Sequence, residues 1–125
     1  MTAEAAPDAP AAATPATPPS PAAEPTVPQL QAAAATFALL GSPSRLHLVW
    51  LMTNAPADVS TLAARAGLSV PTTSQHLSKL RLAGMITARR AGRQLFYSVD
   101  DPHVRTLVEQ IFGHIAPDGS LAPDP

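Results

Sequence analysis

Apolar side chains recur at helical spacing along most of the chain between residues 29 and 115, and Gly, Ser and Pro interrupt this pattern at a few places. The pattern predicts a first helix over about 29–40, which Gly41 ends. A second helix is expected over about 43–54, because Ser42 can cap it and Pro43 suits its first position. Two consecutive helices therefore open the folded part of the chain.

Two shorter helices are predicted next, with very little chain between them. Asp58 or Ser60 can cap a third helix, which Gly67 ends. Ser69 can cap a fourth helix over about 70–83. The tight turn around Gly67 joins the two helices in the manner of a helix-turn-helix, whose second helix presents polar side chains to DNA.

The spacing of apolar residues changes from a helical period to a strand-like one after residue 84. Two strand-like segments, 85–90 and 93–99, flank Ala91-Gly92, which is a two-residue hairpin signal. The sequence therefore predicts a β-hairpin directly after the fourth helix.

A last helix is expected to start at Pro102 and to run to about Ile115, with Asp100 or Asp101 as its cap. The predicted order of elements is ααααββα. This order defines a mainly α fold with a β-hairpin wing (α+β), a winged helix-turn-helix.

The first 28 residues differ in composition from the rest of the chain. They contain ten Ala and eight Pro, no Lys or Arg, and Val27 as the only aliphatic residue larger than Ala. Such a segment cannot bury enough apolar surface to offset the entropy of ordering it, so residues 1–28 are predicted to form a disordered tail. A single domain is expected over 29–116, followed by a flexible end over 117–125.

The same composition argues against several classes of protein. No segment has the basic start and Leu-rich core of a secretory signal, and no run of about 18 apolar residues occurs, so we expect a cytoplasmic protein without a membrane span. The chain contains no cysteine, which excludes disulfides, thiolate metal sites and cysteine catalysis. No Gly-rich phosphate loop, Gly-x-Ser-x-Gly or His-Glu-x-x-His motif occurs, so neither an enzyme nor a small-molecule substrate is expected.

The fourth predicted helix separates polar from apolar side chains. Leu77 and Leu80, with Thr73 one turn earlier, are expected to face inward. A polar stripe at positions i, i+3, i+4 and i+7 is formed by Thr72, Gln75, His76 and Lys79. Amide, hydroxyl and ammonium groups of this kind can bind base edges or phosphates in the major groove.

Charge is unevenly distributed behind a formal net charge of −1. Residues 59–99 contain six cations and no carboxylate, which indicates either a surface for a polyanion or a solvated basic face. Three of these cations surround the hairpin tip, where guanidinium groups suit phosphate contacts or a minor groove. The candidate DNA-binding residues are Thr72, Thr73, Gln75, His76, Lys79, Arg89, Arg90 and Arg93.

The stretch 68–86, followed by Arg89-Arg90-Ala91-Gly92-Arg93 and Phe96-Tyr97, resembles the ArsR/SmtB family of transcriptional regulators. Ser74-Gln75-His76-Leu77 and the opening over 40–46 are also similar to that family, and the resemblance covers roughly residues 37–114. It implies a winged-helix homodimer that is built on the first and last helices and binds an imperfect palindrome. Members are usually repressors that a metal ion or another signal releases from DNA.

The resemblance also implies where a metal ion would bind. The family's cysteine site on the third helix cannot exist here, but Asp101, His103 and His114 match the Asp-x-His-x10-His pattern of a second family site. Eleven residues rotate a helix through three turns plus about 20°, so the two imidazoles share a face while lying about 16 Å apart along the axis. They can meet only across two antiparallel copies of the helix, which gives two equivalent sites per dimer.

The fourth position of that pattern is Pro117, which cannot coordinate, although Asp118 could replace it from a frayed helix end. Imidazole and carboxylate ligands suit Ni(II), Zn(II) or Co(II), and similarity to nickel- and cobalt-responsive relatives favours nickel. In the alternative, Asp101 is only a helix cap, His103 is an exposed residue and His114 complements the helix dipole.

Together these features predict a sequence-specific, homodimeric DNA-binding regulator that responds to a metal ion. Two alternatives stay open. One is a regulator of the same fold without metal sensing, either activator or repressor. The other is a protein-interaction winged helix, whose fourth helix would need an apolar stripe in place of the polar one.

Overall fold

The computed structural model describes residues 23–121, and the chain divides into two units, residues 1–35 and 36–125. The described part of the first unit leads into helix α1 (Val27–Leu40). A capping box starts this helix: the Thr26 N–H donates to Gln29 Oε1 (2.8 Å), and the Gln29 N–H donates to Thr26 Oγ1 (3.2 Å). The helix therefore begins two residues before the predicted start. Of the predicted disordered tail, residues 1–22 lie outside the described residues.

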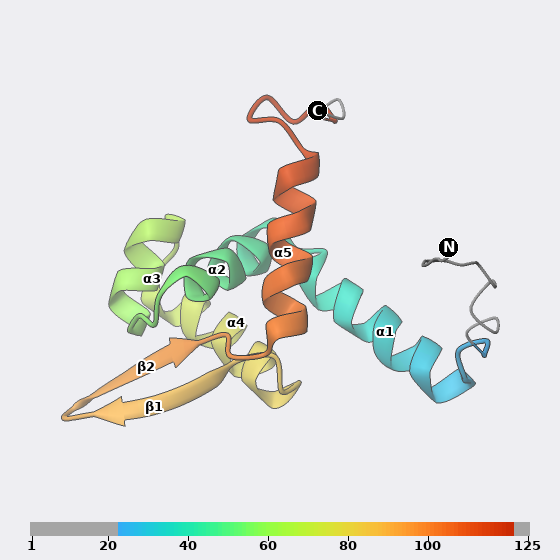
Figure 1. Cartoon of the computed structure of the whole chain (residues 1–125). Helices are drawn as coiled ribbons and strands as arrows, with labels where there is room; N and C mark the ends of the chain where they lie inside the picture. Colours follow the sequence, from blue (N-terminus) through green and yellow to red (C-terminus); the bar gives the residue numbers. More distant parts are fainter. Residues whose placement is uncertain (1–22, 122–125) are drawn as a thin grey trace, which may run out of the picture. The chain divides into compact units, whose positions relative to one another are not determined.

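The second unit contains the remaining elements in the predicted order (Figure 1). They are α2 (Pro43–Asn54), α3 (Val59–Ala66), α4 (Val70–Leu82), β1 (Thr87–Ala91), β2 (Gln94–Ser98) and α5 (Pro102–His114). The order ααααββα and the mainly α fold with one hairpin are thus confirmed. None of the helices in the described part of the chain is long and apolar enough to cross a membrane.

Side chains that accept a hydrogen bond from a backbone N–H begin each helix of this unit. Ser42 caps α2 and Ser69 caps α4, as their positions before Pro43 and Val70 predict. Of the two candidates for α3, Asp58 is the cap (2.9 Å to the Thr61 N–H). Asp101, not Asp100, caps α5 (2.8 Å to the His103 N–H).

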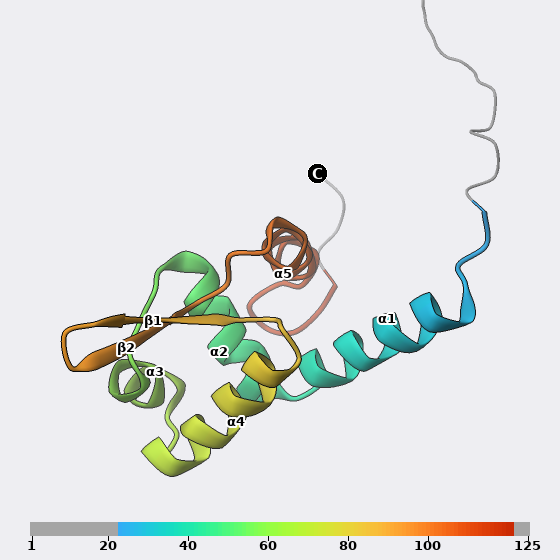
Figure 2. The ribbon, with the colours of Figure 1, turned by 90° about the horizontal axis from the view of Figure 1, so that it is seen from below.

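The core lies around α2, which contacts α3, α5 and β2 (Figure 2). Its buried apolar side chains come from every helix of the second unit and from the segments on either side of the hairpin. They are Leu40, Leu48, Val49, Leu51, Met52, Leu62, Leu77, Leu80, Met85, Ile86, Val99 and Val108. Because few residues form the core, we expect it to give the domain only a modest free energy of unfolding.

The hairpin is a two-stranded antiparallel sheet whose turn lies one residue later than the sequence suggested. Ala91 pairs with Gln94, so the two loop residues are Gly92 and Arg93, not Ala91 and Gly92. Gly92 has a φ of +65°, which the first loop position of a tight hairpin turn favours and which glycine adopts without strain. The backbone conformation of Gly92 at the turn therefore sets the strand register, rather than the alternation of apolar and polar residues along the strands.

A third backbone segment pairs with the hairpin and was not evident from the sequence. Ala57, between α2 and α3, exchanges two backbone hydrogen bonds with Tyr97 of β2 (3.1 and 2.8 Å). Next to it, Gln94 Nε2 donates to Asp58 Oδ2 (2.9 Å). An isolated hairpin is marginally stable, so these contacts matter for holding the wing against the start of α3.

The chain folds back after α5. Ile115 pairs with Leu121, and the Asp118 carboxylate accepts hydrogen bonds from the N–H and the hydroxyl of Ser120 (2.9 and 2.6 Å). The first residues of the end that we expected to be flexible thus form a turn. Residues 122–125 lie outside the described residues.

Candidate nucleic-acid interface

Three residues separate α3 from α4, and backbone geometry fixes their path. Gly67 adopts the left-handed conformation (φ +69°), and its N–H donates to the Ala64 carbonyl (3.3 Å). The Leu68 N–H donates to the Ala63 carbonyl (2.9 Å), which closes the end of α3. Ser69 then caps α4 at once (3.2 Å to the Thr72 N–H), so the two helices form the predicted helix-turn-helix.

One face of α4 is buried and the opposite face is open to solvent. Leu77 and Leu80 are buried in the core, as their spacing predicts. Thr72, Gln75 and Lys79 are exposed, whereas His76 is half-buried at the edge of the stripe. The helix thus presents hydroxyl, amide and ammonium groups on a single outward face.

Thr73 is wrongly included among the candidate DNA-binding residues. Its side chain is 0% exposed, and its hydroxyl donates to the Ser69 carbonyl (2.8 Å). The inward orientation expected from the helical spacing is correct, so a ligand outside the protein cannot reach this side chain. Thr73 belongs to the core.

Leu82 is a surface feature of α4 that the sequence analysis did not consider. Its side chain is 92% exposed. Together with Ser74, Gln75, Ser78 and Lys79 it lines a shallow hollow on the outward face of α4. Leu82 follows Gln75 by seven residues on the same helix, which places it on the face of the polar stripe. This spacing could have predicted from the sequence that Leu82 is exposed.

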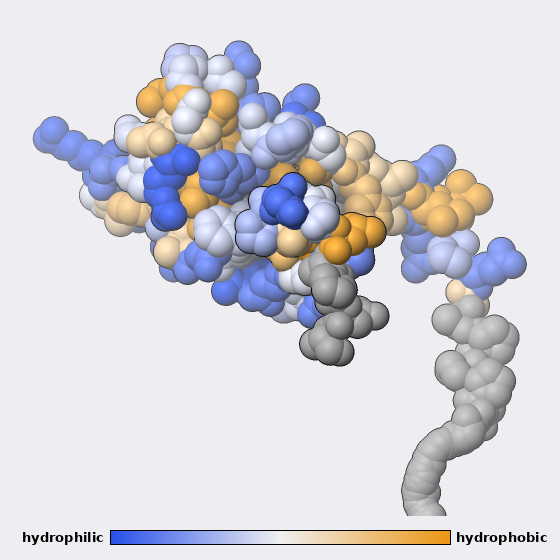
Figure 3. Space-filling view, turned by 90° about the horizontal axis from the view of Figure 1, so that it is seen from above, coloured by the Kyte–Doolittle hydropathy of each residue, from blue (hydrophilic) through white to orange (hydrophobic). Residues whose placement is uncertain are grey.

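Arginine side chains surround the wing. Arg89 and Arg90 are neighbours on β1 and therefore point to opposite faces of the hairpin, whereas Arg93 lies in the loop. All three are exposed, and within residues 23–121 no carboxylate forms an ion pair with them. The end of the molecule that carries the hairpin is hydrophilic (Figure 3, left). The wing therefore offers positive charge to an anionic partner.

The electrostatic environment of α4 favours a neutral His76. Partial burial lowers the pKa of this imidazole below its usual 6.5, and the nearby cations Arg45 and Lys79 lower it further. A neutral imidazole carries one donor and one acceptor, so it can make two different hydrogen bonds. This is suited to reading a base edge, whereas a charged ring would act mainly on phosphate.

The candidate metal ligands fall into two groups at the two ends of α5. Asp101 Oδ1 lies 3.2 Å from His103 Nδ1 at the start of the helix, and both side chains are open to solvent. His114 is exposed at the other end. Among the described residues no three His, Asp or Glu side chains of one copy come together as a metal site. Asp118, considered as a substitute for Pro117, lies beyond the helix and already accepts hydrogen bonds from Ser120.

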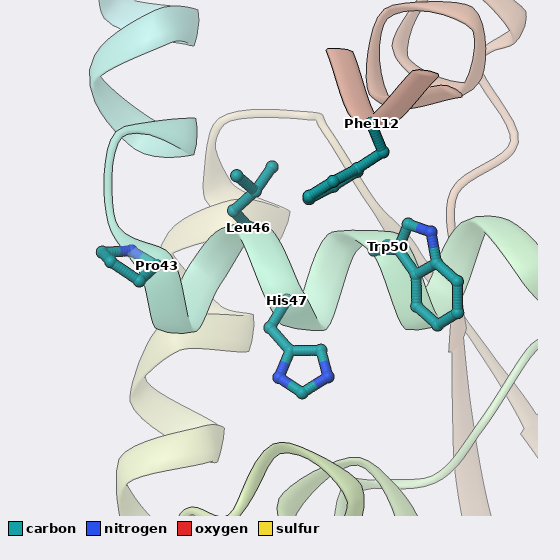
Figure 4. A pocket seen from close by; sticks show the side chains of 5 residues that line it. All are labelled: Pro43, Leu46, His47, Trp50 and Phe112. Carbon is teal, nitrogen blue, oxygen red and sulfur yellow. The ribbon is translucent and has the colours of Figure 1, made fainter. Parts of the chain in front are cut away.

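An apolar pocket of about 540 Å³ lies between α2 and α5 (Figure 4). Pro43, Leu46, His47 and Trp50 come from one face of α2, and Phe112 reaches toward Leu46 from α5. A neighbouring groove is lined by Phe37, Leu40, Gly41, Leu46, Leu107, Val108 and Ile111. Three aromatic side chains of this region are unusually open for their size: Phe37 is 61% exposed, Phe112 is 41% exposed and Trp50 is 38% exposed. This surface is incompletely covered in a single copy of the chain.

The helix-turn-helix, the outward polar face of α4 and the basic hairpin define a winged helix-turn-helix domain of the DNA-binding class. Residues 42–88 match the model of the family described as "Bacterial regulatory protein, arsR family". The chain is 36% identical to the transcriptional regulator NmtR of Mycobacterium tuberculosis over 81 residues, which are 65% of this chain and 68% of NmtR. The chain belongs to the ArsR family, whose members are transcriptional regulators and not enzymes.

Two further comparisons agree with this assignment. The transcriptional regulator KmtR of the same organism is 35% identical over 80 residues, which are 64% of this chain but only 62% of KmtR. The homodimeric winged helix-turn-helix DNA-binding domain of Mb0332 from Mycobacterium bovis superimposes with a TM-score of 0.63 at 25% identity, covering 67% of this chain and 78% of that domain.

The lowered pKa of His76 predicts a pH dependence of stability. Near and below pH 6.5 the unfolded chain binds a proton at His76 more readily than the folded chain does, so the free energy of unfolding falls as the pH falls. His76→Gln should flatten this decline in thermal unfolding measured between about pH 5.5 and 7.5. His47→Gln, at an exposed histidine of α2, is the matched control. An unchanged pH dependence in His76→Gln would contradict the assignment.

Proposed function

We propose that this chain is a sequence-specific DNA-binding transcriptional regulator that binds a palindromic operator as a homodimer. We further propose that a divalent metal ion, nickel in preference to zinc or cobalt, changes its occupancy of DNA. The observation that carries the first proposal is the combination of an outward polar face on α4 with three exposed wing arginines, none of which forms an ion pair with a carboxylate of residues 23–121.

Each part of this surface suits a different part of a DNA duplex. The major groove admits one α-helix, and an amide such as that of Gln75 can bind N6 and N7 of adenine. Lys79, one turn further along, suits phosphate or guanine. The wing arginines are placed to contact the backbone or a neighbouring minor groove, which adds affinity without sequence information.

A winged helix that binds a protein partner would need an apolar outer face on α4. The exposed apolar side chains of this helix are Val70, at its start, and Leu82, at its end. The positions between them, Thr72, Gln75 and Lys79, are polar. Such a face suits base edges and phosphates better than an apolar partner surface, which favours DNA as the ligand.

We expect substitutions in α4 and in the wing to have different effects. Gln75→Ala should reduce the preference for DNA from upstream of the chain's own gene over a mixed-sequence duplex, by about 1–3 kcal/mol for each half-site. Arg93→Ala should weaken binding to both duplexes alike and reduce the dependence on salt by about two phosphate contacts per dimer, one for each copy. Fluorescence anisotropy titrations at several salt concentrations measure both quantities.

Gln110→Ala, at an exposed glutamine of α5, is the control for Gln75→Ala. The assignment of α4 as the reading helix is refuted by a double variant, Gln75→Ala with His76→Ala, that keeps the full sequence preference.

The open apolar groove between Phe37 and Ile111 supports the proposed homodimer. Phe37 is 61% exposed and Ile111 is 38% exposed, and both lie beside buried Val108. Covering such side chains with a partner would stabilise the assembly by roughly 25 cal/mol for each Å² of apolar surface removed from water. A second copy related by two-fold symmetry would cover the same groove on each chain. The homodimeric state of the similar Mb0332 domain is consistent with this arrangement.

Ile111→Glu should convert the dimer into a monomer, because it places a charge in the groove that the second copy covers. Sedimentation velocity at several protein concentrations measures this change. Leu82→Glu is the matched control, because Leu82 is an exposed leucine outside the groove and its substitution should leave the oligomeric state unchanged. A wild-type chain that sediments as a monomer throughout would contradict the dimer.

The proposed metal site combines ligands from two copies of α5. Asp101 and His103 already lie together at the start of the helix (3.2 Å), and in an antiparallel pair His114 of the second copy can join them. Carboxylate and imidazole donors suit Ni(II), Zn(II) and Co(II), and a six-coordinate ion can complete its shell with water. If the ion binds the free and DNA-bound dimers unequally, it changes DNA affinity by the same factor.

His103→Ala and His114→Ala should each abolish most Ni(II) and Zn(II) binding, because each substitution removes a ligand from both symmetry-related sites. Isothermal titration calorimetry of the dimer measures stoichiometry and affinity. His47→Ala, at an exposed histidine of α2, is the control and should bind the metals as the wild type does. Unchanged binding in either α5 variant would rule out the site between the two helices.

A further inference from the structure

A single carboxylate contacts both strands of the wing at its base. Thr87, the first residue of β1, and Ser98, the last residue of β2, are partners in the strand register. The Thr87 hydroxyl donates to Asp100 Oδ2 (2.8 Å), and the Ser98 hydroxyl donates to Asp100 Oδ1 (3.1 Å). The two hydroxyl oxygens are 3.3 Å apart. Each hydroxyl has one proton and donates it to the carboxylate, so Asp100 joins the ends of the two strands. Asp100, Thr87 and Ser98 are here called the Asp100 junction.

The other side of this junction is attached to the start of α5. Asp101 follows directly, caps the helix and is restricted to extended backbone by Pro102. From the helix, Arg105 Nη1 donates back to the Val99 carbonyl (3.1 Å), between Ser98 and Asp100. Val99 itself is completely buried. The short connection between wing and helix is thus fixed at the wing, in the core and at the cap.

The local charges support the same contacts. Hydrogen bonds from Thr87 and then Ser98 lower the pKa of Asp100, and the positive charges of Arg89 and Arg105 lower it further. The carboxylate therefore stays ionised and accepts from both strands at neutral pH. Hydrogen bonds to a charged acceptor are stronger than those between neutral groups.

The wing needs such an attachment because a two-stranded hairpin does not by itself keep a fixed orientation relative to the helices. Buried Ile86 and Val99 anchor the two ends of the hairpin in the core. Apart from its junction with α5, its hydrogen bonds to the helices and their connections lie at Ala57 and Asp58, through Tyr97 and Gln94 of β2. Both of these contacts involve β2 only. Among the side-chain hydrogen bonds of residues 23–121, the one from Thr87 to Asp100 joins β1, the strand that carries Arg89 and Arg90, to a residue outside the hairpin.

We propose that Asp100 is a positioning residue that sets the direction of the wing relative to α5 and so places the wing arginines for DNA. This inference rests on the proposed DNA-binding function. It attributes to Asp100 no contact with DNA: the residue acts through the position of the arginines. Removal of its charge by itself would raise affinity for a polyanion, whereas loss of positioning lowers it, so the two effects have opposite signs.

A double-mutant cycle between the junction and the wing tests the proposal. Thr87→Val with Ser98→Ala removes both hydroxyls without changing the net charge. In the wild type, Arg93→Ala is expected to weaken binding to a mixed-sequence duplex about tenfold, and in the Thr87→Val, Ser98→Ala background by less than about threefold. A change that only lowered stability would leave the Arg93 effect the same in the folded protein, so thermal unfolding of each variant is measured alongside.

The conservative and the truncating substitutions of Asp100 form a second test. In Asp100→Asn the side-chain amide can still bond both hydroxyls, so Arg93→Ala should weaken DNA binding as much as it does in the wild type. In Asp100→Ala these hydrogen bonds are lost, so Arg93→Ala should weaken DNA binding by less than about threefold. Equal costs of Arg93→Ala in all backgrounds would overturn the positioning role while leaving DNA binding intact. If Arg93→Ala costs nothing in the wild type, the proposed function itself fails, and the inference with it.

If the double hydroxyl variant does not unfold cooperatively, Ser98→Ala alone takes its place in the cycle. Ser98 is half-buried and its hydroxyl contacts only Thr87 and Asp100 among the hydrogen bonds of the described residues, so its truncation removes one side of the junction. The same comparison applies: a reduced cost of Arg93→Ala supports the junction, and an unchanged cost contradicts it.

Discussion

The burial of one face of α4 is the constraint on which the proposed interface depends. Leu77 and Leu80 lie in the core with Thr73, and each buried leucine contributes roughly 1.5–3 kcal/mol to stability. Since successive residues on a helix turn by 100°, anchoring these three side chains also fixes where Gln75 and Lys79 point. The same packing that stabilises the domain therefore aims the polar stripe outward. A helix free to rotate about its axis could not present a constant set of groups to a duplex.

The wing differs from α4, because none of its strand residues is fully buried, although most of β2 is half-buried and Tyr97 packs against the core. Its direction comes from hydrogen bonds at its base and along β2: the Ala57–Tyr97 pair, the Asp58–Gln94 contact and the Asp100 junction. Exposed hydrogen bonds are individually weak, so the wing is expected to be the more adjustable part of the surface. The proposed interface therefore combines a rigidly packed α4 with a hairpin whose direction depends on a few hydrogen bonds.

Much of this arrangement could be predicted from the sequence, because short-range chemistry decides it. Ser42 and Ser69, each followed closely by Pro, mark helix starts, and Gly67 marks the turn of the helix-turn-helix. The outward stripe of α4 also follows from residue spacing alone. Thr73 shows that side-chain chemistry and helical spacing can disagree. Its hydroxyl is suited to binding DNA, but its position in the helix buries it.

The remaining features depend on contacts between residues distant in sequence. Nothing local indicates that Ala57 pairs with Tyr97, or that Asp100 binds both ends of the hairpin while Asp101 caps α5. The one-residue shift of the hairpin turn has a local cause instead, because alternation of side chains constrains the strands less than the positive φ of Gly92 does. The candidate metal ligands at the two ends of α5 come together only in the proposed pair of copies.

The central claim is that two copies of α4 enter successive major grooves on one side of a duplex. Hydroxyl-radical footprinting of DNA from upstream of the chain's own gene tests it most directly. We predict two equivalent protected regions, with their centres about one helical turn or a multiple of it apart, and sequences related by two-fold symmetry. Protection of a single half-site, or no protection at protein concentrations that saturate binding, would contradict the claim.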